Sequence, residues 1–262
     1  MLNRIKQKML SGQVASSMAI RLVRTPEIAH IAHSAGFDGL YIDMEHNTFT
    51  IGEAAQICAA ALACDITPFV RVPAGAHDLA ARLLDGGALG IIAPHLETAD
   101  DVQRIVNISK FPPFGTRGAV NNLPHFSYRN VKASEANPQL NEETMVIGMI
   151  ETLSALDNID EILAVDGLDM VLIGTNDLTA EKGIPGQYDH PFVRDAYRSV
   201  IASANKHGKF VGVGGLASRA DLVADFVKLG ARYVSTGTDL SFLLSASTAK
   251  AAFVAGLDIP HQ

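Results

Sequence analysis

Cysteine is scarce in this sequence: the only two, Cys58 and Cys64, fall in one apolar stretch with a helical pattern. Residues six positions apart do not share a helix face, so neither a disulfide nor a pair of metal ligands is indicated. We expect two buried thiols. No cluster of His or Cys has the spacing of a zinc site.

Positive charge is also scarce, because the net charge is -7 and no run of Lys and Arg offsets it. Attraction to nucleic acid or to anionic membranes is therefore disfavoured. No apolar run approaches the length of a membrane span, and residues 1–11 lack the apolar segment of a secretory signal. We expect a cytoplasmic protein with no nucleic-acid partner and no membrane partner.

Most of the sequence repeats one pattern: a short apolar run, a turn and an amphipathic helix. Strands are expected over residues 14–22, 38–43, 67–72, 89–93, 145–150, 168–174, 209–213 and 233–236. Helices are expected over residues 26–35, 51–63, 79–84, 99–109, 155–164, 192–207, 219–229 and 240–255. Several strands are continuous runs of Val, Ile, Met or Phe, which is typical of parallel strands covered on both faces.

Eight strands alternating with helices fit either a closed barrel or a doubly wound open sheet. The count of eight and the length of 262 residues favour a single α/β domain, a (β/α)8 TIM barrel over residues 1–262. No G-x-G-x-x-G follows the first strand, which argues against a dinucleotide fold. Residues 111–143, rich in Pro, Asn and Ser, interrupt the pattern and predict a long loop: a lid, an interface segment or a mobile connection.

The active site of such a barrel lies at the carboxyl ends of its strands. Charged and polar residues gather there in this sequence: Asp43-Met44-Glu45-His46, Arg71, Pro94-His95, Glu151 and Gly174-Thr175-Asn176-Asp177. Charged groups beside buried strand ends are costly unless they are paired or bound to metal. Their concentration predicts a functional site at this rim.

Glu151 and Asp177 follow neighbouring strands, so their carboxylates can repel, share a proton or hold a divalent cation. Oxygen ligation completed by water suits Mg²⁺, Mn²⁺ or a similar ion. In the alternative, Asp177 only caps a short helix that runs through Lys182, and Glu151 only pairs with Arg71. Both interpretations stay open at this point.

Asp43 and His46 share a strand end and the turn after it. A carboxylate can fix the tautomer of a neighbouring imidazole and raise its basicity, which would make His46 a general base. The alternative is a histidine that is simply hydrogen-bonded in a turn. Arg71 can bind a carboxylate or stabilise an enolate oxygen, or it forms only a structural ion pair with Glu45 or Glu151.

The backbone N–H groups of Asn176 and Asp177, which follow Gly174-Thr175, are expected to begin a helix and to form an anion site. Gly214-Gly215 and Gly237 could hold a phosphate in the same way, or be glycine for steric reasons. None of the lysines is expected at the carboxyl end of a strand. A Schiff base is therefore not expected, and carbanion chemistry would need a metal as electron sink.

Several short motifs lie in order between residues 12 and 250: Asp43-Met44-Glu45-His46, Pro68-Phe69-Val70-Arg71-Val72-Pro73, Leu84-Asp85-Gly86-Gly87-Ala88, Phe114-Gly115-Thr116-Arg117-Gly118, Ile150-Glu151-Thr152 with Ala155-Leu156, and Ile173-Gly174 with Asp177-Leu178. As a set they resemble the HpcH/HpaI aldolase/citrate lyase family. The pattern is most similar to the 4-hydroxy-2-oxoheptanedioate and 2-dehydro-3-deoxyglucarate aldolases. That resemblance implies a class II pyruvate aldolase on a (β/α)8 barrel.

The resemblance also implies roles for single residues. Glu151 and Asp177 would bind the metal, Arg71 would stabilise the pyruvate enolate, and His46 with Asp43 would form the acid/base dyad. The backbone at Asn176 and Asp177, next to Gly174, would bind the pyruvate carboxylate.

The resemblance further implies a homo-oligomer, a hexamer built as a trimer of dimers, with a swapped C-terminal helix. The apolar stretch 243–257 is consistent with burial against a neighbouring subunit. Asp85 would lie near that interface and support the proton network.

Four positions depart from the family pattern. Met149 stands where Gln is common, Thr175-Asn176 where Pro-Ala is common, and His95 where an apolar residue is expected. Gly214-Gly215 leaves space where side chains could contact the acceptor. We expect none of these positions to touch the metal or the base, and all of them to bear on the choice of aldehyde.

The expected reaction cleaves, or forms, 4-hydroxy-2-oxo acids to pyruvate and an aldehyde, with Mg²⁺, Mn²⁺ or Co²⁺ chelating the 2-oxo acid. His46 removes the proton of the 4-hydroxyl, and the metal and Arg71 hold the resulting enolate. Metal-dependent decarboxylation of a 2-oxo acid such as oxaloacetate shares this enolate and stays open. A non-catalytic sensor that binds 2-oxo acids is the alternative outside catalysis.

Overall fold

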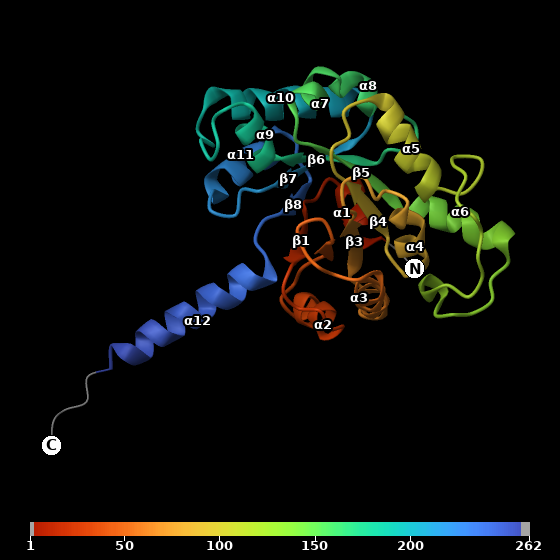
Figure 1. Cartoon of the computed structure of the whole chain (residues 1–262), viewed down its shortest axis with the longest axis horizontal. Helices are drawn as coiled ribbons and strands as arrows, with labels where there is room; N and C mark the ends of the chain where they lie inside the picture. Colours follow the sequence, from red (N-terminus) through yellow and green to blue (C-terminus); the bar gives the residue numbers. More distant parts are fainter. Residues whose placement is uncertain (1–2, 258–262) are drawn as a thin grey trace.

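Eight parallel strands hydrogen-bond in chain order, and the last strand pairs with the first. They are β1 Ala15–Ile20, β2 Gly39–Asp43, β3 Thr67–Arg71, β4 Gly90–Ala93, β5 Met145–Ile150, β6 Met170–Gly174, β7 Phe210–Gly214 and β8 Tyr233–Ser235. This computed structural model describes residues 3–257, and in it the helices surround a closed barrel (Figure 1). The predicted TIM barrel is confirmed, and the open doubly wound sheet is excluded.

Most predicted helices are found within two residues of their expected bounds: α2 Glu27–Ser34, α3 Ile51–Ala63, α4 Leu79–Asp85, α5 Ala99–Ser109, α10 Pro191–Lys206, α11 Ala220–Leu229 and α12 Asp239–Ala255. Threonine begins α3, α5 and α12, each time in a capping box that satisfies two backbone N–H groups. The helix predicted over 155–164 is two helices, α7 Leu153–Asp157 and α8 Ile159–Leu163, which meet at Asn158.

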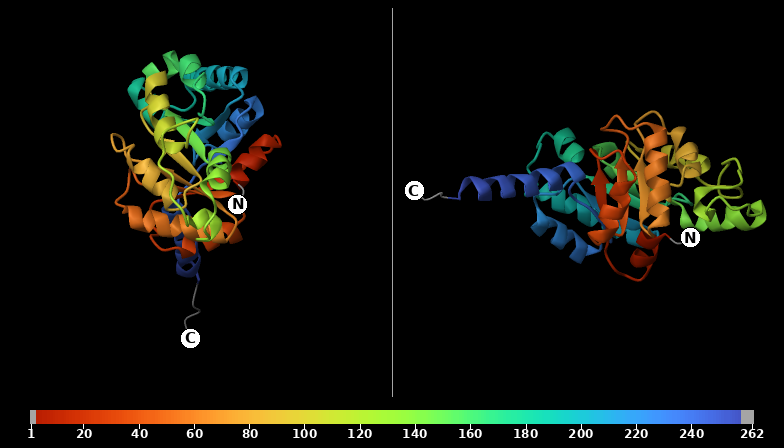
Figure 2. Two further views of the ribbon diagram at one scale, coloured as in Figure 1. Left: turned by 90° about the vertical axis from the view of Figure 1, so that its right-hand side faces the viewer. Right: turned by 90° about the horizontal axis from the view of Figure 1, so that it is seen from below.

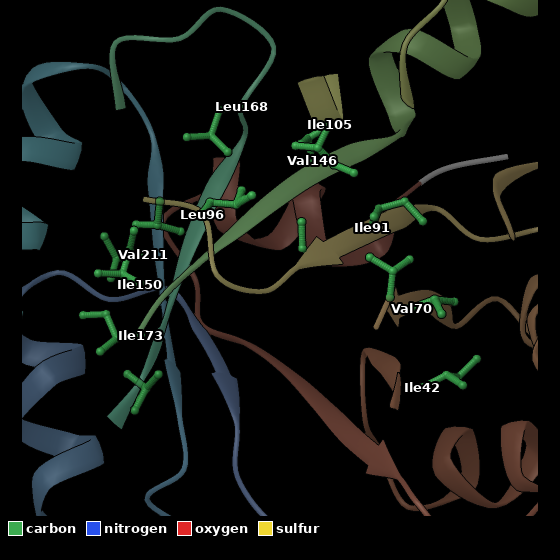
Figure 3. Close-up of a cluster of buried hydrophobic side chains, with 14 of the residues drawn as sticks. Ile42, Val70, Ile91, Leu96, Ile105, Val146, Ile150, Leu168, Ile173 and Val211 are labelled. Atoms are coloured by element: carbon green, nitrogen blue, oxygen red, sulfur yellow. The ribbon is translucent and has the colours of Figure 1, made fainter. Parts of the chain in front are cut away.

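Alternate strand residues point into the barrel and out toward the helices. The inward set, with Ile5 and Met9, forms one apolar cluster that includes Tyr41, Phe69, Met149 and Leu172. The outward set packs under the helices and includes Ile42, Val70, Ile150 and Ile173 (Figure 3). Because both layers are apolar, the strands read as continuous hydrophobic runs in the sequence.

Helix α1 Arg4–Leu10 was not expected, because the segment is polar and basic with only two buried side chains. Those side chains, Ile5 and Met9, belong to the apolar cluster inside the barrel. Asn3 caps the helix, and its backbone N–H donates to Glu143. Helix α1 therefore closes the barrel at the end opposite the carboxyl rim.

The segment 111–143 is not the long loop that was predicted. It contains a short 3-10 helix, η1 Pro124–Phe126, and an eleven-residue helix, α6 Ala133–Glu143. It buries an apolar cluster of its own, made by Phe111, Leu123, Ala136 and Leu140. Within residues 3–257 none of this segment lines the cavity at the carboxyl rim, so it is not a lid over this chain's own site.

Helix α12 projects away from the barrel (Figures 1 and 2). Only its first residue, Asp239, is buried, and its apolar side chains are exposed: Leu240, Phe242, Leu243, Leu244, Phe253 and Val254. Among the described residues, no helix is both long and apolar enough to cross a membrane. Cys58 is fully buried and unpaired, but Cys64 is partly exposed, so the expectation of two buried thiols is wrong for Cys64.

Candidate active site

A cavity of about 400 Å³ opens at the carboxyl ends of the strands. Six of the residues predicted for the site line it: Asp43, His46, Arg71, Gly174, Asn176 and Asp177. The register of the strands explains why Asp43, Arg71 and Gly174 meet at this cavity. Tyr41, Phe69 and Leu172 face the barrel interior, so the residues two positions further along also face inward, above the apolar layer.

Arg71 and Asp43 form a two-point ion pair across neighbouring strands. Nε of Arg71 donates to Oδ1 of Asp43 at 3.0 Å, and Nη2 donates to Oδ2 at 2.7 Å. Burial opposes ionisation of Asp43, but the hydrogen bond and charge of Arg71 outweigh it and lower the pKa of that carboxyl. Asp43 is therefore a fixed negative charge that orients Arg71.

The predicted pairing of the His46 imidazole with the Asp43 carboxylate is wrong for this structure. Asp43 instead accepts hydrogen bonds from the backbone N–H groups of Glu45 and His46, at 3.1 and 3.2 Å. The carboxylate that faces the imidazole is Glu45, with 3.9 Å between its Oε2 and Nε2 of His46. Asp43 sets the turn that presents His46, whose side chain is 54% exposed at the cavity.

Glu45 is a site residue that sequence reasoning treated only as an ion-pair partner. Its Oε2 lies 2.9 Å from Nη1 of Arg71, and its Oε1 lies 3.9 Å from Nε2 of His95. Glu45 therefore stands between one guanidinium and two imidazoles. Its place between Asp43 and His46 in the sequence was the available signal.

Glu151 is almost fully buried, with 2% of its side chain exposed, and its Oε1 accepts the backbone N–H of His95 at 2.8 Å. Burial raises the pKa of Glu151, the nearby charges of Glu45 and Asp177 raise it further, and His95 counteracts them. The alternative in which Glu151 pairs with Arg71 is wrong, because Arg71 pairs with Asp43 and Glu45. Glu151 does not line the cavity itself but lies against Gly174, which does.

Asp177 stands at the third position of α9 Thr175–Glu181, and Gly174 precedes the helix as its N-cap residue. The helix that was expected to start near Asn176 is therefore present. The alternative in which Asp177 is the N-cap is wrong. The residues of this first turn, Thr175, Asn176 and Asp177, line the cavity, and the start of a helix favours an anion.

The donor set at this rim suits a hard divalent cation. Glu151 directly follows β5 and Asp177 stands in the first turn after β6, and burial together with the charges of Glu45 and Asp177 raises the pKa of Glu151. Among residues 3–257 no group of three or more His, Cys, Asp or Glu side chains forms a closed metal cage. A carboxylate on the cavity wall, Asp177, and a buried one against Gly174, Glu151, fit a cation whose other ligands are substrate and water.

His95, one of the four positions that depart from the family pattern, contacts Glu151, the residue predicted to bind the metal. It has a left-handed backbone, with φ 52°, and its Nδ1 lies 3.4 Å from Oε1 of Glu151. Histidine tolerates this conformation better than most residues, and it aims the backbone N–H of His95 at the Glu151 carboxylate. His95 thus holds Glu151 in place.

Among the other positions that differ from the family pattern, Met149, Thr175 and Asn176 contact nearby side chains and backbone. Sδ of Met149 lies 3.7 Å from Nη1 of Arg71. The Thr175 hydroxyl bonds to the Tyr197 hydroxyl and to the Gly214 carbonyl, both at 2.9 Å. Asn176 accepts a hydrogen bond of 2.6 Å from the Tyr188 hydroxyl. These contacts fix the strand-six turn on which an anion would sit.

Asp85 does not line the cavity of its own chain. It ends α4, which runs back from the carboxyl rim, and it accepts a 2.7 Å hydrogen bond from Nη2 of Arg117. No lysine lines the cavity among the described residues, in keeping with the expected absence of a Schiff-base lysine.

Comparisons with known proteins show the family of this chain. The model of the family described as HpcH/HpaI aldolase/citrate lyase matches residues 21–246. A 4-hydroxy-4-methyl-2-oxoglutarate aldolase of Hapsidospora irregularis is 35% identical, over 98% of this chain and 96% of the relative. A hydroxypyruvate/pyruvate aldolase of Roseobacter denitrificans is 31% identical, over 96% of each chain.

A solved structure is also closely similar. The crystal structure of an HpcH/HpaI aldolase from Desulfitobacterium hafniense superposes with a TM-score of 0.90 at 29% identity, and 98% of each chain is covered. The structure of the citrate synthase SbnG has a TM-score of 0.83 at 29% identity, over 96% of this chain and 98% of that one. The likeness therefore extends over nearly the whole barrel.

Proposed function

Because the chain belongs to the HpcH/HpaI aldolase/citrate lyase family, we propose that this rim cleaves, or forms, the C3–C4 bond of 4-hydroxy-2-oxo acids. The products of cleavage are pyruvate and a carbonyl compound, so the enzyme is a carbon–carbon lyase. The relatives described above are aldolases of this kind. The observation that carries the proposal is the meeting of Arg71, His46 and the first turn of α9 in one cavity, beside Glu151.

A divalent cation such as Mg²⁺, Mn²⁺ or Co²⁺, held by Glu151 and Asp177, would supply Lewis-acid stabilisation to the carboxylate and keto oxygens of a 2-oxo acid. The backbone N–H groups at Asn176 and Asp177 bind the substrate carboxylate, since the start of a helix favours an anion. His95 keeps the carboxylate of Glu151 in place.

Side chains that follow or end strands β2 and β3 accept the hydroxyl proton and stabilise the negative charge that develops on the enolate. His46, beside Glu45, removes the proton of the 4-hydroxyl directly or through water, and the C3–C4 electron pair passes into the enolate. Arg71 lies at the cavity with its orientation fixed by Asp43, and its charge stabilises the enolate oxygen. Protonation at C3 then gives pyruvate.

We also propose a cytoplasmic homo-oligomer, a hexamer made of three dimers, in which α12 of each chain packs on a neighbour. The exposed apolar side chains of α12 support this arrangement, since a single chain leaves them in water. In that assembly Asp85 would approach the site of an adjacent subunit, which its own chain does not allow.

An acceptor screen tests the proposed activity. Metal-depleted protein is incubated with pyruvate and a set of aldehydes and oxo acids, with and without Mg²⁺, Mn²⁺ or Co²⁺, and the products are followed by NMR. Aldol products that appear only with metal support the proposal. Loss of oxaloacetate without any aldol product would make the enzyme a decarboxylase instead, and pyruvate binding without turnover would make the protein a sensor.

A further inference from the structure

Arg21 is a second guanidinium in the cavity, and it belongs to none of the motifs that carry the family resemblance. It directly follows β1, whose residues Ala19 and Ile20 pair with Tyr41 and Ile42, so Arg21 stands beside Asp43. Its Nε donates to Oδ2 of Asp43 at 2.8 Å. The two arginines differ in access, because 41% of the Arg21 side chain is exposed and only 5% of the Arg71 side chain.

The charge of Asp43 does not require Arg21. Arg71 already binds both oxygens of that carboxylate and uses its third nitrogen on Glu45. Arg21, in contrast, uses only Nε, and within residues 3–257 neither Nη1 nor Nη2 has a hydrogen-bond partner. The pair of Nη atoms is the edge of a guanidinium that binds a carboxylate with two parallel hydrogen bonds.

The backbone of Arg21 is held rigidly before any ligand arrives. Asp239, the first residue of α12, accepts the backbone N–H of Arg21 at 2.9 Å. The same carboxylate accepts the N–H groups of Leu22 and Val23 at 2.9 and 2.7 Å. Asn47 donates to the carbonyl of Arg21 from the next loop. A fixed backbone lowers the cost of using the side chain as an anchor.

The position of Arg21 matches the far end of a substrate. In the ring of eight strands β1 and β6 are three strands apart, by way of β8 and β7, so Arg21 and the turn at Gly174–Asp177 stand on well-separated parts of the one cavity wall. The lining between them includes small residues, Ala19, Gly215, Ala217 and Gly237, which leave room for a ligand. A 2-oxo acid bound at the start of α9 would extend its acceptor half toward Arg21.

We propose that Arg21 binds a carboxylate on the acceptor half, so that the enzyme acts on 4-hydroxy-2-oxo dicarboxylic acids. This inference rests on the proposed function. In cleavage the 4-hydroxyl loses its proton to the base, and the C3–C4 electron pair becomes the pyruvate enolate. C4 becomes the carbonyl carbon of an oxo acid, whose carboxylate remains on Arg21. Pyruvate and an oxo acid are therefore the two products.

Glyoxylate and glycolaldehyde test this assignment, since both are two-carbon aldehydes and only glyoxylate carries a carboxylate. With pyruvate and Mn²⁺, the Arg21→Met variant is expected to lose about 10- to 100-fold in kcat/KM for glyoxylate, the range for a lost charged hydrogen-bond pair. The value for glycolaldehyde is expected to stay within about threefold. Arg21→Lys, which keeps the charge and loses the planar fork, should retain part of the glyoxylate rate.

Arg24→Met is the matched control, because it removes a positive charge from the same loop but Arg24 does not line the cavity. Both acceptors should react with it as with the unmodified enzyme. Equal losses for both acceptors in the two Arg21 variants would mean that Arg21 only orders Asp43, and would overturn the inference. An unmodified enzyme that prefers glycolaldehyde would overturn it too, whereas one that condenses pyruvate with no acceptor at all would overturn the proposed function itself.

Discussion

Gly174 lies directly beside Glu151, and a β-carbon on Gly174 would come within 2.9 Å of both Cβ and Oε2 of Glu151. The glycine is needed for space and not for its backbone angles, since its φ of -82° is open to any residue. The other oxygen of Glu151 is held by the backbone N–H of His95. Two neighbours, Gly174 at the end of β6 and His95 in the loop after β4, thus fix the position of one buried carboxylate.

Replacing Gly174 with alanine should therefore displace Glu151. We expect Gly174→Ala to weaken Mn²⁺ binding and to lower kcat/KM, each by roughly 10- to 100-fold, because groups that orient a ligand matter nearly as much as the ligand. Titration calorimetry with Mn²⁺ and steady-state kinetics measure the two effects. Gly52→Ala, where a β-carbon would meet nothing closer than 3.9 Å, is the control. Unchanged Mn²⁺ affinity in Gly174→Ala would show that the packing against Glu151 is unimportant.

The role of Glu151 itself is tested by Glu151→Gln, which keeps the shape and removes the charge. Turnover with metal should fall by at least about 10²-fold, and Mn²⁺ binding should fall with it, because a neutral amide is a poor ligand for a hard cation. A strong chelator should have the same effect on the unmodified enzyme. Glu161→Gln, on the exposed face of α8, serves as control. Full activity after both treatments would contradict a metal-dependent mechanism.

His46→Gln should slow the reaction by roughly 10²- to 10⁴-fold, the usual contribution of a positioned general base. The substrate should still bind, since Arg71 and the first turn of α9 remain, so kcat is expected to fall more than KM rises. His33→Gln, an exposed change on α2, should behave as the unmodified enzyme. The proton-transfer role of His46 would be wrong if kcat stayed the same.

The stability of the fold should fall in mildly acidic solution because of His125. This side chain is the buried residue of η1 and bonds to the Ala88 carbonyl, and burial lowers its pKa from 6.5 to about 4. Below pH 6.5 the imidazole of His125 binds a proton in the unfolded chain, but in the folded chain it stays neutral until the pH falls to about 4. The free energy of unfolding should therefore decrease between these values, by up to about 3 kcal/mol at 1.36 kcal/mol per pKa unit.

Urea unfolding between pH 7 and pH 4 measures this effect. His125→Gln can still donate to Ala88 but does not titrate, so its free energy of unfolding should vary less with pH. His30→Gln, an exposed change on α2, should keep the slope of the unmodified protein. Equal slopes in His125→Gln and the unmodified protein would assign the pH dependence to other groups.

The exposed apolar side chains of α12 lead us to expect that the protein forms an oligomer through this helix. A charge in its apolar surface, as in Leu243→Glu with Leu244→Glu, should convert the oligomer to smaller species, because both leucines are exposed in the single chain. Light scattering after size exclusion gives the molar mass. An unmodified protein that is already monomeric at micromolar concentration would contradict the proposed hexamer.

Much of the fold could be predicted because most strands are apolar on both faces and several outer helices are amphipathic. That pattern is local, so β5 and α5 were placed to the residue. Helices α1 and α6 were missed because their partners are distant in sequence: Ile5 is buried inside the barrel, and Leu140 packs against Phe111. A helix stabilised by such contacts carries little periodic signal of its own.

The barrel, the family and the types of side chain at the rim could be read from the linear pattern, since strand ends, charges and motif order are local features. The contacts between the side chains at the rim could not, because they depend on the folded barrel. In the folded chain Asp43 forms ion pairs with Arg71 and Arg21 and not with the His46 imidazole. The backbone N–H of His95 donates a hydrogen bond to Glu151. The physical reason is that ring closure and strand register, which no single segment encodes, choose the neighbours of each inward side chain.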